Sequence, residues 1–92
     1  MTYGYTKEKD ALLKRLARIE GQVRGISGMV DDDRYCIDIL TQIGAVRAAL
    51  DKVSLGLMDG HVRHCVLGAE PTQRHQKTEE LVQAVGRLMR TR

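Results

Sequence analysis

Hydrophobic residues recur from Leu12 to Val30 with spacings that alternate between four and three residues. This alternation places them on one face of an α-helix and is typical of helices that pack as coiled coils. The face consists of Leu12, Leu16, Ile19, Val23, Ile26 and Val30. We expect this first helix to begin after Thr6, whose hydroxyl is suited to an N-cap.

The same alternation returns in Ile39, Ile43, Val46, Leu50, Val53 and Leu57. It predicts a long second helix from about residue 34 to about residue 66, which ends near Gly68 and Pro71. Residues 31–33 are all aspartate, and we expect this run to break the first helix and to N-cap the second. A shorter third helix is predicted around Leu81, Val85 and Leu88, and no strand pattern appears.

These three amphipathic helices, joined by two short connections, predict an all-α protomer. The first two helices form an antiparallel hairpin, and hairpins from two copies pair into a four-helix bundle. The chain has 92 residues without Phe or Trp, so its aliphatic core is small, which favours association between identical chains. We expect residues 1–92 to form a single domain. Gly21, Gly25 and Gly28 share another face of the first helix, and close helix packing is the simplest explanation for them.

Charge is distributed unevenly along the chain, whose net charge is +3. Residues 1–30 carry six Lys and Arg against three acids, residues 31–60 three against six, and residues 61–92 six against three. Ten of the fifteen cations are Arg, whose planar guanidinium group suits phosphate recognition. A solvated helix surface would explain the same charge pattern.

Two cysteines without an apolar signal segment favour a reducing, cytoplasmic location. The apolar runs are shorter than the ~20 residues of a membrane-spanning helix, so we expect no membrane partner. The phosphate-binding glycine motifs of nucleotide enzymes are missing, and three thin helices provide no obvious cleft for catalysis. The sequence therefore predicts a protein that is not an enzyme.

Candidate chemistry lies in three thiol and imidazole groups. His61 and Cys65 are four residues apart, so one turn of helix brings them within reach of one metal ion, although such a pair is more often buried packing. Cys36 precedes His61 by 25 residues, roughly 37 Å along a continuous helix, so one chain cannot unite the three. Two second helices paired antiparallel about a two-fold axis near Leu50 would bring Cys36 of one chain level with the other two groups.

Two thiolates and one imidazole form a soft donor set that suits Cu(I), whereas tetrahedral Zn(II) needs a fourth donor. His64 points about 100° away from His61 around the helix, and we expect it at the surface. His75 precedes the apolar stripe of the third helix and is expected to be solvated.

Three segments carry a family resemblance: residues 18–26 (RIEGQVRGI), 35–42 (YCIDILTQ) and 61–65 (HVRHC). They resemble the copper-sensing repressors of the CsoR/RcnR family, and the similarity extends from about Tyr5 to Arg90. The resemblance implies a helical homodimer that assembles into a tetramer. It also implies a transcriptional repressor that binds operator DNA in the apo form and leaves it when Cu(I) binds.

By the same resemblance, Cys36 is a metal ligand from one protomer, and His61 and Cys65 are ligands from the other. Tyr35 and Glu80 match positions that hydrogen-bond toward the metal-bound imidazole, with Glu79 as the alternative to Glu80. The residues expected to contact DNA are Lys14, Arg15, Arg18, Arg47, Lys52, Arg74 and Lys77.

Other branches of the family differ at informative positions. Nickel and cobalt sensors have His where Cys65 stands, persulfide sensors lack the histidine found here at position 61, and formaldehyde sensors have Pro where Thr2 stands. Copper is therefore the expected effector. Two alternatives are a repressor of the same fold that senses thiol oxidation or persulfide, and a cytoplasmic copper buffer.

Overall fold

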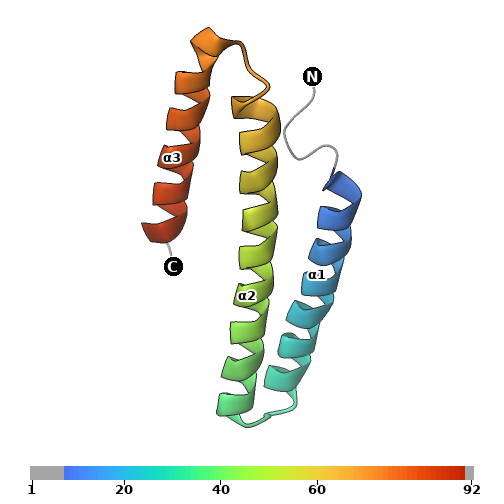
Figure 1. The fold of residues 1–92 in the computed structure, drawn as a ribbon. Helices are drawn as coiled ribbons and strands as arrows, with labels where there is room; N and C mark the ends of the chain where they lie inside the picture. The colour runs from blue at the N-terminus through green and yellow to red at the C-terminus, as the bar shows by residue number, and fades with distance from the viewer. Residues whose placement is uncertain (1–7, 91–92) are drawn as a thin grey trace. The chain divides into compact units, whose positions relative to one another are not determined.

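The computed structural model describes residues 8–90, which form helices joined by turns (Figure 1). The elements are α1 (Lys9–Asp31), α2 (Cys36–Gly60), the π-helical segment η2 (His61–Val66), the 3₁₀ turn η3 (Pro71–Gln73) and α3 (Arg74–Arg90). The prediction of an all-α protomer with three principal helices is confirmed. Thr6, the predicted N-cap of α1, lies outside the described residues.

The described chain divides into two compact units. One unit holds α1 and the part of α2 that ends at Leu55, and the other includes the end of α2 from Gly56 together with η2, η3 and α3. None of the described helices combines the length and apolarity needed to cross a bilayer.

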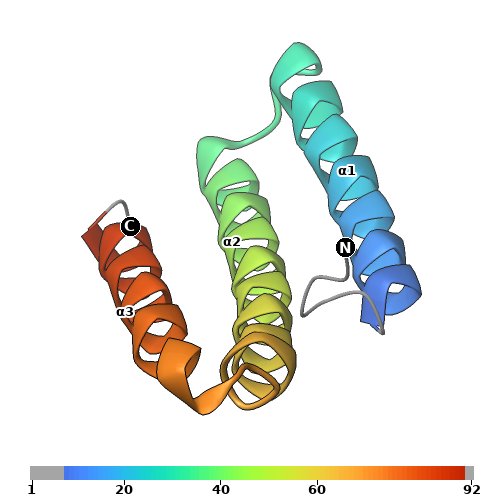
Figure 2. The same ribbon diagram turned by 90° about the horizontal axis from the view of Figure 1, so that it is seen from above.

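The first unit is an antiparallel helical hairpin (Figures 1 and 2). Its core consists of Leu12 and Ile19 on α1 and Val46 and Val53 on α2, each less than one tenth exposed. Ile26 and Ala49 pack against this core. Successive core residues on each helix are seven apart, so the hairpin buries one row of the predicted apolar face on each helix.

The second row of each apolar face stays uncovered. Val23 on α1 is 47% exposed and Leu50 on α2 is 44% exposed. Leu16, Val30 and Ile43 belong to the same rows and are also exposed. A single hairpin therefore satisfies only half of the coiled-coil pattern in its sequence.

The glycines of α1 do not mark a close contact within the described chain. A Cβ atom added at Gly25 or Gly28 would meet nothing within 4 Å, and one added at Gly21 would only touch the flexible end of Arg24 at 3.8 Å. Close helix packing at these glycines, expected from the sequence, is not found in the protomer.

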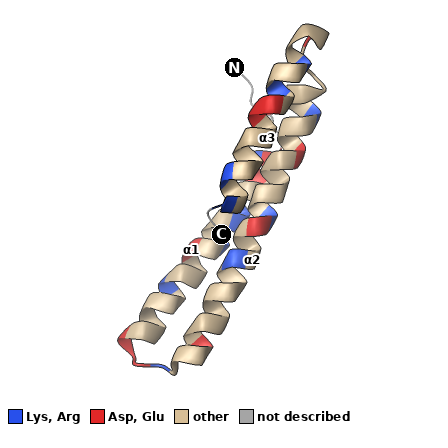
Figure 3. Ribbon diagram, turned by 90° about the vertical axis from the view of Figure 1, so that its left-hand side faces the viewer, with Lys and Arg blue, Asp and Glu red and all other residues tan. Residues whose placement is uncertain are grey.

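The aspartate run ends α1. The amide of Asp33 donates to the carbonyl of Val30 (3.1 Å), and the amide of Arg34 donates to the carbonyl of Met29 (2.9 Å). These two bonds form a Schellman motif, which requires a left-handed residue just past the helix end. Asp33 takes that role with φ 55°, a conformation in which Asp is tolerated better than most residues. Figure 3 shows the acidic residues gathered at this turn.

The prediction that the aspartates cap α2 is therefore wrong. α2 begins at Cys36, and the carbonyl of Tyr35 accepts from the amides of Asp38 (3.0 Å) and Ile39 (3.3 Å). Because Asp33 is held by the end of α1, two further residues must separate it from the start of α2. The acidic run is thus a C-terminal signal for one helix and not an N-terminal signal for the next.

The predicted end of the second helical run near residue 66 is correct, but its last six residues are π-helical. The amide of Leu67 donates to the carbonyl of Val62 across five residues, at 2.9 Å. After the turn at Gly68 and the 3₁₀ segment, α3 folds back against η2. This second unit therefore places α3 beside the segment that carries His61 and Cys65.

Candidate functional site

His61 and Cys65 lie in the same π-helical turn. His61 is the first residue of η2, and Cys65 is the next to last. Both side chains are half-buried. Single π-helical turns within α-helices occur frequently at functional sites. The expectation that these two residues share one turn of helix is met, although the turn is wider than an α-helical one.

The His61 ring has a defined partner on α3. Its Nε2 atom lies 3.3 Å from the main-chain carbonyl oxygen of Lys77. A carbonyl oxygen can only accept, so Nε2 carries the proton and donates it. In the neutral ring this leaves the lone pair of Nδ1 free for another partner.

Glu80 and Lys77 form an ion pair next to this contact. Lys77 Nζ lies 3.9 Å from a carboxylate oxygen of Glu80, with side chains 39% and 51% exposed. At this separation and exposure the pair contributes little stability. Lys77 was predicted as a DNA contact and Glu80 as a partner of the imidazole. In the structure these two side chains pair with each other, and it is the main-chain carbonyl of Lys77 that accepts a hydrogen bond from His61.

Cys36 lies in the other compact unit, as the first residue of α2, and is exposed. Tyr35, immediately before it, is 66% exposed. Both cysteines are free thiols. Among residues 8–90 of the single chain, no group of three His, Cys, Asp or Glu side chains is placed to hold a metal ion.

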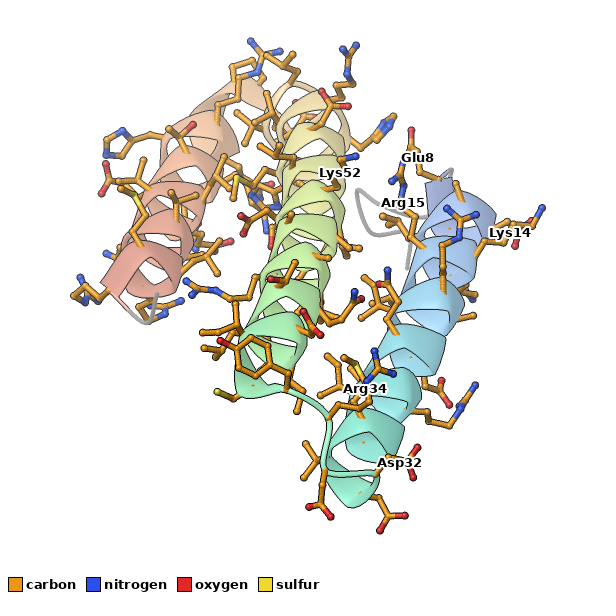
Figure 4. All side chains as sticks on the ribbon, turned by 90° about the horizontal axis from the view of Figure 1, so that it is seen from below. Glu8, Lys14, Arg15, Asp32, Arg34 and Lys52 are labelled. Carbon is orange, nitrogen blue, oxygen red and sulfur yellow. The ribbon has the colours of Figure 1, made fainter. Side chains whose placement is uncertain are left out.

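Basic side chains line a groove within the α1–α2 hairpin. The groove has a volume of about 320 Å³, and its cationic residues are Arg15 and Arg18 from α1 and Lys52 from α2. Figure 4 shows Arg15 and Lys52 on facing sides of the hairpin, and Lys14 on the side of α1 away from α2. The short side chains of Ala45, Ala48 and Ala49 form much of the remaining wall. The structure thus brings three of the seven predicted DNA contacts together.

Arg74, another predicted DNA contact, has partners within the chain. Its Nε donates to the carbonyl of Ala69 (3.3 Å), and its Nη2 donates to the carbonyl of Leu67 (3.4 Å). Sequence reasoning missed this role because main-chain acceptors leave no trace in residue type. Arg47, on α2, is exposed.

The profile of the metal-sensitive transcriptional repressors matches residues 8–87, so the chain belongs to that family. Its members repress transcription, which makes double-stranded DNA a partner of this chain and places it outside the enzymes. The resemblance identified in the sequence is thereby confirmed.

Particular relatives are similar over most of the chain. The copper-sensing transcriptional repressor RicR of Mycobacterium tuberculosis is 58% identical over 67 residues, which cover 73% of this chain and 70% of the relative. The crystal structure of the copper-sensing repressor CsoR with Cu(I) from Geobacillus thermodenitrificans has a TM-score of 0.82 at 44% identity, covering 90% of this chain and 88% of that one. The nickel-responsive transcriptional regulator InrS has a TM-score of 0.73 at 39% identity, covering 85% and 89%. The fold thus occurs with more than one metal, and the donor atoms must decide between them.

Proposed function

We propose that the chain is a Cu(I)-responsive transcriptional repressor, which binds operator DNA without metal and dissociates when Cu(I) binds. The metal ligands are Cys36 of one protomer and His61 and Cys65 of its partner. The observation that carries the proposal is the π-helical turn, which presents a thiol and an imidazole together, with the second ring nitrogen of that imidazole already engaged by α3. The similarity to copper-sensing repressors supports the same effector.

The donor set fits Cu(I). Cys36 and Cys65 are free thiols. When deprotonated they are soft ligands, which bind Cu(I) in preference to harder cations. The free Nδ1 of His61 supplies one nitrogen donor, and the hydrogen bond from Nε2 to the Lys77 carbonyl fixes the orientation of the ring. Imidazole suits nickel as well as copper, whereas soft thiolates select Cu(I), so the two thiols favour copper over nickel as the effector.

A second copy of the chain is needed to complete this site. The uncovered apolar rows of α1 and α2 support the packing of two hairpins into a four-helix bundle, because a second hairpin would bury Val23 and Leu50. Antiparallel pairing of two α2 helices then carries Cys36 to the His61 end of the partner. We propose this dimer as the building block of a tetramer, with residues 1–92 acting as one domain.

DNA binding is proposed to rest on cationic side chains that contact phosphates. Arg15, Arg18 and Lys52 line one groove, and their charges favour a strand backbone laid across it. Lys14 and Arg47 are exposed and add to the candidate surface, while Lys77 and Arg74 already have partners in the chain. Because the proposed target is operator DNA, we propose that the protein acts in the cytoplasm of its cell.

Metal and DNA binding are linked through the dimer. If Cu(I) weakens DNA binding by a given factor, DNA must weaken Cu(I) binding by the same factor. Titrations of Cu(I) with and without operator DNA therefore measure the same coupling free energy from both sides.

The test is fluorescence anisotropy of a labelled fragment from upstream of the gene, under anaerobic conditions, before and after one Cu(I) per protomer. Tight binding by the apo protein should be lost on copper addition. The variants Cys36→Ala and His61→Ala should bind DNA but ignore copper, whereas His75→Ala should behave as wild type. A full copper response by His61→Ala would disprove the ligand assignment, and no specific apo binding would favour a copper buffer.

A second candidate is a repressor that senses oxidation or persulfide at the same thiols. The exposure of Cys36 favours it, because an accessible thiol is open to oxidants. Mass spectrometry after peroxide treatment would detect a disulfide between Cys36 and Cys65 of two protomers, formed as peroxide takes two electrons and is reduced to water. After treatment with excess inorganic polysulfide, which already holds oxidised sulfur and releases sulfide, it would detect a polysulfide bridge between the same thiols. Release of DNA by such treatment without metal would support this function over copper sensing.

A further inference from the structure

We propose that Gly68 and Arg74 are positioning residues of the metal site. Together they hold the π-helical turn in the form that presents His61 and Cys65 side by side, so Arg74 serves the metal site and not the DNA surface. This inference rests on the proposed Cu(I) site. All of its contacts lie within the unit that contains η2 and α3.

Position 68 requires glycine because it lies very close to the backbone of the π-helical turn. A Cβ atom at this position would lie 2.6 Å from the main-chain oxygen of His64 and 3.4 Å from its carbonyl carbon. Both are backbone atoms, which cannot move aside as a flexible side chain would. His64 lies between the two proposed ligands in η2. Any larger residue at position 68 must therefore displace the backbone that joins the two ligands.

Arg74 contacts the backbone that follows the same turn. Helices end with carbonyl groups that have no partner in the helix, and the guanidinium of Arg74 donates to two carbonyls just beyond η2, those of Leu67 and Ala69. A planar guanidinium can donate in two directions at fixed geometry, whereas the ammonium of Lys is a single point charge. The positive charge also complements the negative end of the helix dipole.

Arg74 and His61 together tie η2 to the first turn of α3. Arg74 is the first residue of α3, and its side chain donates back to the carbonyl of Ala69. Three residues later, the carbonyl of Lys77 accepts a hydrogen bond from the His61 ring. These two contacts hold both ends of the segment, one through its imidazole and one through the carbonyls that follow it. Without the Arg74 contact, the turn is free to return to ordinary α-helical hydrogen bonding, which would rotate Cys65 relative to His61.

The experiment compares Arg74→Ala and Arg74→Lys with the control Arg87→Ala, which removes an exposed charge from the same helix. In the full-length protein, Cu(I) affinity is measured anaerobically by competition with a chromophoric Cu(I) chelator, and apo DNA binding is measured on the same samples. We expect both Arg74 variants to lose about tenfold in Cu(I) affinity, the scale for groups that orient metal ligands. Their apo DNA binding should match that of Arg87→Ala.

The opposite pattern would overturn the proposal. If Arg74→Ala keeps its Cu(I) affinity but loses DNA affinity, and Arg74→Lys restores it, Arg74 is a phosphate contact. If Arg74→Lys restores Cu(I) affinity, charge alone matters and the two-carbonyl geometry does not. Wild-type protein that fails to bind Cu(I) would instead reject the proposed function, so the two failures are distinguishable.

A spectroscopic readout separates a positioning role from general destabilisation. X-ray absorption of the Cu(I) complex should show two sulfurs and one nitrogen in the wild type and a reduced nitrogen contribution in Arg74→Ala. Gly68→Ala should show the same change if it folds, as judged by circular dichroism. A wild-type copper spectrum in both Arg74 variants would contradict the proposal even if Gly68→Ala failed to fold.

Discussion

The Nε2 atom of His61 and the main-chain carbonyl oxygen of Lys77 lie 3.3 Å apart, although the two residues are 16 positions apart in the sequence. This contact joins the π-helical segment to α3. It also determines which ring nitrogen is available to a metal, because the donor nitrogen cannot also be a ligand.

The tautomer of His61 can be tested in the apo protein. We expect the neutral ring to carry its proton on Nε2, because the main-chain carbonyl of Lys77 can only accept a hydrogen bond. Long-range ¹H–¹⁵N correlation spectra of ring-labelled protein above the titration range of His distinguish the two tautomers. The solvated His75 provides a reference ring in the same sample. A proton on Nδ1 of His61 would contradict the contact.

The basic groove makes a prediction about salt. Replacing both Arg15 and Lys52 with Gln should weaken DNA binding and reduce the slope of log K against log salt concentration by roughly 1 for each cation. Arg24→Gln is the matched control, because Arg24 is exposed but already paired with Glu20 at 2.9 Å. Binding isotherms at several salt concentrations give the slopes. Equal slopes for the double variant and the control would show that the groove does not contact DNA.

Asp33→Gly should stabilise the protein. The left-handed backbone at position 33 costs a residue with a side chain roughly 1 kcal/mol, and Gly avoids this cost. Asp32→Gly should show no such gain, because position 32 is not left-handed. Urea unfolding at fixed protein concentration measures both variants. A stability loss in Asp33→Gly would mean that the aspartate side chain contributes more than its conformation costs.

Shortening Ile19 should reveal how much the hairpin core contributes. Ile19 is 7% exposed between the two helices, so Ile19→Ala should lower the free energy of unfolding by about 2–5 kcal/mol. Ile19→Val removes a single methylene and should cost about 0.5–1.5 kcal/mol. Chemical unfolding monitored by helical circular dichroism gives both values. Equal, small losses would place Ile19 outside the core.

Much of the fold could be predicted from the sequence. Regular spacing of apolar residues predicted α1 and α2, because burial of one helical face leaves a period of 3.6 residues in the chain. The same spacing could not show that Leu12 and Ile19 meet α2 while Leu16 and Val23 remain exposed. Which row of an apolar face a hairpin covers depends on the rotation of each helix, and both rows consist of aliphatic residues.

The proposed metal ligands could be predicted from the sequence, but the contacts that hold them in place could not. Thiols and imidazoles are rare and chemically distinctive, so Cys36, His61 and Cys65 stand out. The contacts of His61 with the Lys77 carbonyl and of Arg74 with two further carbonyls involve the backbone, which is the same at every position. The π-helical turn was missed for a related reason, since an i to i+5 hydrogen bond has no residue signature of its own.

The hairpin core consists of four side chains, each with less than a tenth of its surface exposed. So small a core gives a lone protomer little free energy to resist opening, and open chains are substrates for proteases. In the proposed dimer, binding of a second copy would stabilise the folded state by mass action, so stability would rise with protein concentration. Protomers that find no partner would be degraded first, and the cell would retain chiefly those repressor molecules that have assembled their sensing site.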